Sequence, residues 1–172
     1  MPERLRERPV ALSVDLTDIG GDWSELGDDA IAVFSAADAV ARTPGVLEGA
    51  SSVSIALSSD EDVARLNAAY RGKSKPTNVL SFPAGRGAPA GFLGDIALAA
   101  ETITREAAEQ GAPFAHHVQH LVVHGLLHLL GYDHETDADA ERMEALETSI
   151  LAGLGVADPY AGERPPQSTA KE

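Results

Sequence analysis

A chain of 172 residues, 44% of them hydrophobic, is long enough to bury one substantial core, so we expect a single soluble domain. It contains no cysteine, which excludes disulfide bonds and thiolate metal sites and leaves His, Asp and Glu as the strong metal ligands. The formal net charge of -14 argues against extended nucleic-acid binding, because phosphate groups require positive potential. No stretch has the pattern of a membrane span or a secretory signal, so we expect no membrane partner and a cytoplasmic location.

The first half of the chain alternates predicted strands and helices, judged from the spacing of their apolar residues. In chain order these are a strand at 10–17, a helix at 28–42, a strand at 51–58 and a helix from 58 to about 70. Ser58 and Glu61 have the spacing of a capping box, which predicts where the second helix begins. The polar segment between the first strand and the first helix, which contains Trp23, is predicted to be a turn.

The second half predicts two more strands and three more helices. These are strands at 77–82 and 92–99 and helices at 101–110, 113–130 and 137–154. Short strands interleaved with helices indicate a single α+β or α/β domain, to which we assign residues 1–156. The proline-containing, charged segment 157–172 is predicted to be a disordered C-terminal tail.

Three histidines have a spacing suited to a metal ion. From His124 to His134 the sequence reads H-G-x-x-H-x-x-G-x-x-H. On a helix, His124 and His128 project from one face about one turn apart, and Gly131 can end the helix in a left-handed conformation. The reversal would bring His134 towards the first two rings. Three neutral imidazoles with an open fourth position form a catalytic zinc site, so we expect one zinc ion per chain here. The alternative is three core histidines hydrogen-bonded to backbone carbonyls.

The metzincin zinc proteases carry the same histidine spacing, with one difference that bears on the reaction. They place a glutamate directly after the first histidine, where this chain has Gly125. That glutamate is the general base of the protease, so a peptidase mechanism of this kind lacks its base here. A metal hydrolase of peptides or of another substrate is therefore an alternative that the chemistry disfavours.

A basic segment interrupts the acidic chain. Residues 63–94 contain no Asp or Glu, but they include Arg71, Lys73 and Lys75. The planar guanidinium of Arg71 can grip phosphate oxygens and stabilise charge that develops on a transferring phosphoryl group, and the two lysines would guide a nucleic-acid backbone. The alternatives are a solvated loop with a few cations and a surface arginine paired with a nearby carboxylate.

Two stretches together carry a family resemblance. They are LNAAYRGKSKPTNVLSFP at 66–83 and HGLLHLLGYDH at 124–134, with Gly94-Asp95-Ile96 between them. From about residue 51 to residue 154 the chain resembles the YbeY family of bacterial endoribonucleases and rRNA maturation factors. Ser74 departs from the family pattern, in which an acid is more usual. The resemblance implies the α+β class, with a mixed four-stranded sheet packed with about five helices.

The resemblance also implies a zinc-dependent, single-strand-specific endoribonuclease that matures the 3′ end of small-subunit (16S) rRNA and serves ribosome quality control. In this family His124, His128 and His134 would hold the zinc, and Arg71 would take part in cleavage. Zinc lowers the pKa of bound water and polarises phosphoryl oxygens, and the nucleophile could be that water or the RNA 2′-hydroxyl. Expected partners are single-stranded rRNA, small-subunit ribosomal proteins and an assembly GTPase. The main alternative is a ribosome assembly factor whose zinc is structural.

Two carboxylates and three further histidines lie near these motifs. Asp133 either orients a ligand histidine or belongs to the turn, and Asp95 either orients a ligand or water or belongs to a strand-end turn. Each four-residue step drifts about 40° round a helix, so histidines N-terminal to the motif point away from the metal. We expect them to support the site from outside or to lie on the surface; they are His116, His117 and His120.

Overall fold

The computed structural model describes residues 11–72 and 77–161. Its centre is a four-stranded sheet with the order β1-β2-β4-β3. The strands are β1 Leu12–Asp18, β2 Ser51–Ser58, β3 Val79–Pro83 and β4 Phe92–Ala99. β1 and β4 run parallel to β2, whereas β3 runs antiparallel to β4. The expected mixed four-stranded sheet of the α+β class is confirmed, and each observed strand lies within two residues of its predicted bounds.

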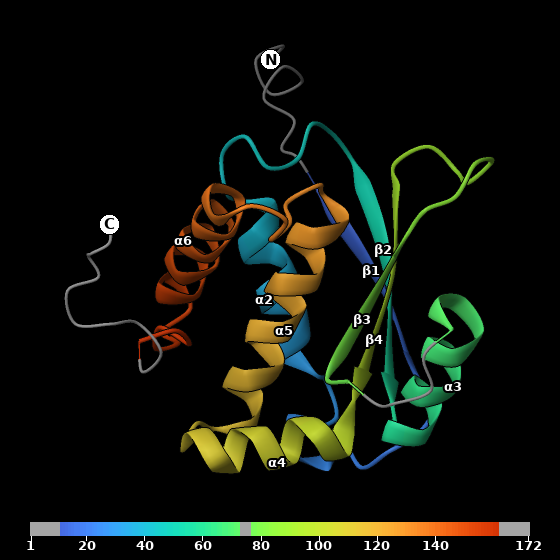
Figure 1. Cartoon of the computed structure of the whole chain (residues 1–172), viewed down its shortest axis with the longest axis vertical. Coiled ribbons are helices and arrows are strands. Elements are labelled where there is room, and N and C mark those ends of the chain that lie inside the picture. The colour runs from blue at the N-terminus through green and yellow to red at the C-terminus, as the bar shows by residue number, and fades with distance from the viewer. Residues whose placement is uncertain (1–10, 73–76, 162–172) are drawn as a thin grey trace.

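Five α-helices and one short 3-10 helix surround this sheet in the described part of the chain. They are η1 Ser24–Leu26, α2 Ile31–Ala41, α3 Asp60–Arg71, α4 Ala100–Gln110, α5 Phe114–Leu129 and α6 Asp137–Gly153. Figure 1 shows α2, α5 and α6 on one side of the sheet, α3 on the other, and α4 across one end. None of the described helices is both long and apolar enough to cross a bilayer.

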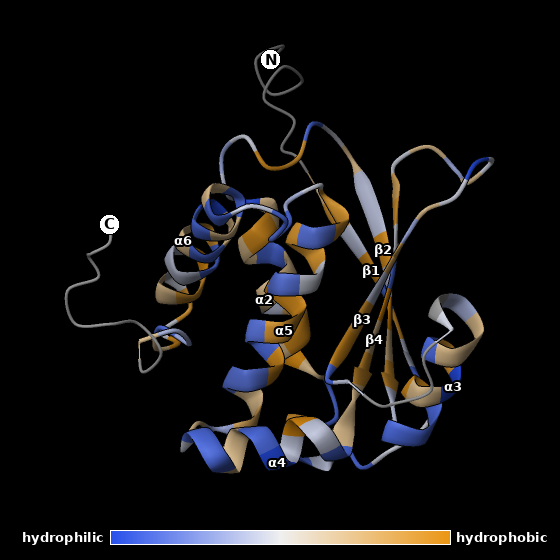
Figure 2. Cartoon of the chain, viewed as in Figure 1, coloured by the Kyte–Doolittle hydropathy of each residue, from blue (hydrophilic) through white to orange (hydrophobic). Residues whose placement is uncertain are grey.

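The main core lies between the sheet and the helices α2 and α5, which both contribute buried apolar residues to it. Alternate residues of β2 point to this side, and Val53 and Ile55 are fully buried. On α5, Val122 and Leu126 are fully buried within the same cluster. Apolar and polar positions alternate along α5 in Figure 2, which reflects a helix with one face in the core and the other near its surface. The core therefore fixes the rotation of α5 and the direction of its polar side chains.

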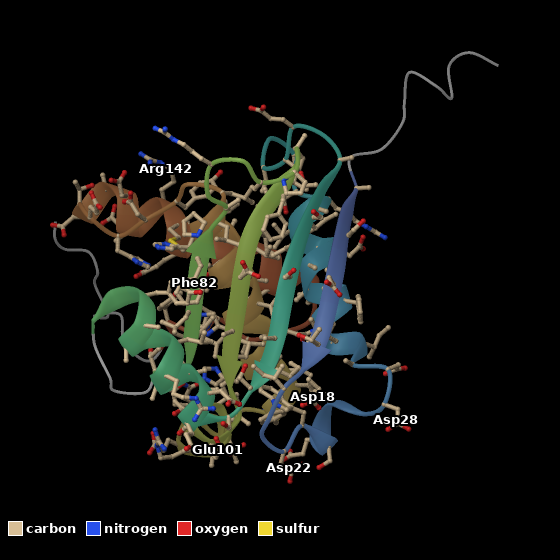
Figure 3. The ribbon with its side chains drawn as sticks, turned by 90° about the vertical axis from the view of Figure 1, so that its right-hand side faces the viewer. Asp18, Asp22, Asp28, Phe82, Glu101 and Arg142 are labelled. Atoms are coloured by element: carbon tan, nitrogen blue, oxygen red, sulfur yellow. The ribbon has the colours of Figure 1, made fainter. Side chains whose placement is uncertain are left out.

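The other sheet face is only partly covered, as Figure 3 shows with Phe82 labelled beside α3. A small second cluster, which includes Val63 of α3 and Leu80 of β3, joins that helix to the sheet. The uncovered part forms a groove of about 810 Å³. Its polar and aromatic lining includes Asp15, Thr17, Ser54, Tyr70, Phe82 and Asp95.

Three local expectations differ from the structure. The capping box of α3 uses Ser59 and Asp62, one residue later than predicted, because the preceding Ser58 is fully buried at the end of β2. Trp23 was expected in a polar turn but is buried; its Nε1–H donates to the Gly20 carbonyl at 2.9 Å. Of the predicted tail at 157–172, residues 157–161 are described and form a turn, whereas 162–172 lie outside the described residues.

Candidate metal centre

Gly125 sets how α5 approaches the sheet. A Cβ atom added here would lie 3.1 Å from Ile96 Cδ1 and 3.2 Å from Ser81 Oγ. The Ser81 hydroxyl also donates to the Gly125 carbonyl at 3.4 Å. Any side chain at this position would have to displace these two side chains by a few tenths of an ångström, so close packing favours glycine here over the glutamate of the proteases.

The three motif histidines lie together on the side of α5 that leaves the core. The ring centroids of His124 and His128 are 6.4 Å apart and those of His124 and His134 are 5.2 Å apart, with interplanar angles of 7° and 17°. Gly131 has a φ of 106°, and Tyr132 N–H donates to the Leu127 carbonyl at 3.0 Å, which closes the turn after the helix. Glycine at the reversal therefore places His134 beside His124, as the spacing predicts.

The donor chemistry of this cluster fits zinc, although the rings are not arranged around a common point. Within 11–72 and 77–161, no three His, Asp or Glu side chains are placed as the ligands of one ion. With Zn–N bonds of about 2.0–2.1 Å, the centroids of two imidazoles on a tetrahedral ion lie about 5 Å apart. The His124–His134 separation of 5.2 Å matches this value and the His124–His128 separation of 6.4 Å exceeds it. His128 and His134 are both exposed on the outer side of the cluster.

Glu147 lies directly behind His124 and is fully buried on α6. Its Oε2 is 2.5 Å from His124 Nδ1, its Oε1 accepts a hydrogen bond from the Tyr160 hydroxyl, and Oε1 is 3.5 Å from His120 Nε2. Burial raises the pKa of Glu147, but hydrogen bonds from His120 and His124, the charge of His124 and the Tyr160 hydroxyl outweigh it and lower the pKa to about 2. Because a carboxylate oxygen accepts this hydrogen bond, a neutral His124 ring carries its hydrogen on Nδ1 and leaves Nε2 as the nitrogen that can bind a metal.

Glu147 and Tyr160 were not predicted from the sequence, although α6 contains one signal for the first of them. Glu147 occupies the same buried stripe as Met143, Ile150 and Leu151, at helical spacing. An acid at a core position requires a partner, and this requirement could have directed attention to the histidines of α5. Tyr160 could not have been found in this way, since it lies in a segment predicted to be disordered.

Two other histidines of α5, His117 and His120, lie behind the cluster. His117 is 4% exposed, and its Nε2 lies 2.8 Å from Glu106 Oε1 on α4. Burial lowers the pKa of His117 and outweighs the opposing effect of the hydrogen bond that His117 donates to Glu106. The His120 ring lies between those of His117 and His124, with centroid distances of 5.8 and 6.4 Å. These side chains support the helix packing behind the cluster and do not lie on the open surface.

None of the remaining candidate residues is seen within the histidine cluster in the part of the chain that the structure describes. Arg71 is the last residue of α3, and its side chain lies outside the described residues, as do Lys73 and Lys75. Asp133 accepts a hydrogen bond from Glu135 N–H at 3.1 Å, an interaction within the turn. Asp95 lines the groove on the sheet face opposite α5, so it is not assigned to the histidine cluster; burial there raises its pKa. The alternation of a strand explains this correction, because the neighbouring Ile96 points towards α5.

Comparisons with known proteins agree over most of the chain. The sequence model of the family described as Endoribonuclease YbeY matches residues 24–155. A protein named Endoribonuclease YbeY from a Rhodopseudomonas palustris strain is 50% identical over 152 residues, which cover 82% of this chain and 77% of that protein. One of the same name from Parvibaculum lavamentivorans is 46% identical over 176 residues, covering 95% and 93%. The solution structure of TM1509 from Thermotoga maritima has a TM-score of 0.50 at 21% identity and covers 92% of this chain and 99% of that one, a likeness of fold.

Proposed function

This chain belongs to the YbeY endoribonuclease family, and from this premise we propose that it is a zinc-dependent endoribonuclease that cleaves single-stranded RNA. Its proposed substrate is the 3′ end of small-subunit (16S) rRNA, in maturation and ribosome quality control. The observation that carries the proposal is the family match across residues 24–155, a range that contains both the histidine cluster and the basic segment. An rRNA substrate implies a cytoplasmic location, with small-subunit ribosomal proteins and an assembly GTPase as proposed partners.

One zinc ion is proposed to be held by His124, His128 and His134. When bound, zinc would lower the pKa of water and neutralise charge on a phosphoryl oxygen. Glu147 supports this role for His124, since it occupies Nδ1 and leaves Nε2 available. His128 and His134 are exposed, so a strand of RNA can reach the cluster from solvent without a rearrangement of the core.

The basic segment is proposed to supply a local excess of positive charge on a chain that is acidic as a whole. Arg71 would hold non-bridging phosphate oxygens and stabilise the charge that develops on phosphorus, while Lys73 and Lys75 would guide the RNA backbone. Because the whole chain has a net charge of -14, repulsion from the remaining surface would keep RNA contacts confined to this segment and the histidine cluster.

The proposal can be tested with a single-stranded RNA that carries the 3′ end of small-subunit rRNA. Cleavage would be compared between the zinc-loaded chain and the variants Arg71→Ala and His128→Ala, with zinc content and circular dichroism measured for each. Arg42→Ala is the control, because Arg42 is an exposed arginine paired with Asp38 at 2.8 Å on α2. We expect Arg71→Ala to lower the rate roughly 100-fold without loss of zinc, and Arg42→Ala to have no effect.

Two other results would change the assignment. The same trace of cleavage in all four proteins would identify a contaminating nuclease and reject the proposal. Loss of folding in His128→Ala, together with unaltered RNA binding in Arg71→Ala, would instead favour an assembly factor with a structural zinc site.

A further inference from the structure

We propose that Glu147 is a positioning residue that holds the His124 ring in one orientation, with Nε2 directed at the metal. The inference rests on the proposed zinc site and adds a residue of α6 to it. It starts from the separation of 2.5 Å between Glu147 Oε2 and His124 Nδ1.

The two partners of this hydrogen bond differ in burial. The side chain of Glu147 is 0% exposed, whereas that of His124 is 25% exposed. The ring is therefore anchored from inside the protein at one nitrogen and reaches solvent at its other edge. His128 and His134 are its ring neighbours on that outer side, at centroid distances of 6.4 and 5.2 Å.

Glu147 is itself held by groups from separate parts of the chain. The Tyr160 hydroxyl donates to Oε1, and Asp158 anchors the segment that carries this tyrosine. Asp158 Oδ1 accepts from Tyr160 N–H at 2.8 Å and from the Thr148 hydroxyl at 3.2 Å. With both oxygens engaged the carboxylate cannot rotate freely, so the orientation of His124 is set by the fold and does not depend on the presence of the metal.

The energetic cost of burying the Glu147 carboxylate indicates that it has a functional role. A buried charge is costly to desolvate, and apolar residues of similar volume often stabilise a core as well or better. The neighbours of Glu147 in the stripe of α6 are the apolar residues Met143, Ile150 and Leu151. A carboxylate that holds a metal-binding histidine fixes its tautomer and raises its basicity, and loss of such a partner typically weakens metal binding about 10–100-fold.

The test is the zinc affinity of the full chain, measured by competition with a chelator of known affinity. Glu147→Gln keeps the size of the side chain but removes its charge, and we expect roughly 10–100-fold weaker zinc binding. Glu106→Gln is the matched control, because Glu106 makes the equivalent contact at 2.8 Å with His117, which is not a proposed ligand. Glu106→Gln should bind zinc like the unmodified chain, and equal zinc affinity in Glu147→Gln would overturn the proposal.

A second measurement does not require a variant that folds. Long-range ¹H–¹⁵N NMR spectra of the unmodified, metal-free chain report the tautomer of each histidine. We expect the neutral His124 ring to carry its hydrogen on Nδ1, and a neutral ring with its hydrogen on Nε2 and none on Nδ1 would overturn the inference. If the chain shows the Nδ1–H tautomer but binds no zinc, the proposed zinc site fails while the orientation by Glu147 stands, so the two failures are distinguishable.

Discussion

Two histidine–carboxylate pairs lie along α5, and they are buried in opposite ways. In the pair His117–Glu106 the histidine side chain is 3% exposed and the carboxylate is 28% exposed. In the pair His124–Glu147 the carboxylate is 0% exposed and the histidine is 25% exposed. In each pair the buried side chain is held in place by its surroundings. The first pair therefore joins the buried ring of His117 to α4, whereas in the second the buried carboxylate of Glu147 holds a His124 ring that faces solvent.

The difference shows that contact type alone does not identify a functional histidine. Both pairs have short separations, 2.8 and 2.5 Å, and both join α5 to a neighbouring helix. Of the two, only His124 has exposed imidazoles beside it, those of His128 and His134, and an outer edge that a ligand can reach. The direction of burial therefore separates a packing role for His117 from the proposed ligand role for His124.

Replacement of each histidine by alanine should separate the two pairs most strongly. Loss of the metal removes several kcal/mol of transition-state stabilisation, so we expect His124→Ala to lower RNA cleavage by on the order of 10²–10³-fold. His117→Ala should retain zinc and most of its cleavage per folded molecule. Equal losses in both variants, measured at equal folded fractions, would show that the two pairs are not functionally different.

Removal of each carboxylate should separate them again, this time in stability. Glu147→Ala leaves buried polar partners and a cavity, so we expect the metal-free chain to lose about 3 kcal/mol of unfolding free energy. Glu106 is partly exposed, and Glu106→Ala should cost about 1 kcal/mol. Urea unfolding at neutral pH measures both values, and a larger loss for Glu106→Ala would contradict the comparison.

The Tyr160 hydroxyl provides a smaller test of how firmly Glu147 is held. Tyr160→Phe removes one hydrogen bond to the buried carboxylate and leaves its contact with His124 intact. We expect a loss of about 1 kcal/mol in unfolding free energy and little change in zinc affinity. A loss of zinc affinity as large as that of Glu147→Gln would mean that the C-terminal turn, not the carboxylate alone, orients the ring.

The pH dependence of stability should report the buried His117. Glu106 of α4 and His120 of α5 face this ring, and burial lowers its pKa below the ordinary value. The unfolded chain then binds more protons than the folded chain, so stability is retained above a pH of about 6.5 and decreases as the pH falls below it. Urea midpoints between about pH 7.5 and 5.5 should show a shallower decrease in His117→Gln, and an unchanged slope would contradict this explanation.

Much of the fold could be predicted from the sequence because the evidence for it is local. Apolar periodicity gave the strands at 51–58 and 92–99 with their observed bounds, and the histidine spacing with Gly131 brought His134 beside His124. Glu147 lies 23 residues from His124, and nothing in its neighbourhood along the chain specifies which helix it meets. Such contacts depend on how α5 and α6 pack.

The placement of Asp95 and the start of α3 show two other limits. Asp95 precedes the run Ile96-Ala97-Leu98-Ala99, which is apolar on both sheet faces, so the alternation that would reveal its direction is hidden. The capping box begins one residue later than predicted because pairing with β4 extends to the end of β2. In both cases the neighbouring strand of the sheet determines the outcome, and the sequence of the segment alone does not show which strand will lie beside it.

The most direct test of the proposed metal centre is zinc K-edge X-ray absorption on the chain loaded with one equivalent of zinc. We predict one bound zinc with three imidazole nitrogens at about 2.0–2.1 Å. His128→Ala should lose one imidazole from this shell or lose the metal. A zinc shell without imidazole, or one that is unchanged in His128→Ala, would contradict the assignment of His124, His128 and His134 as its ligands.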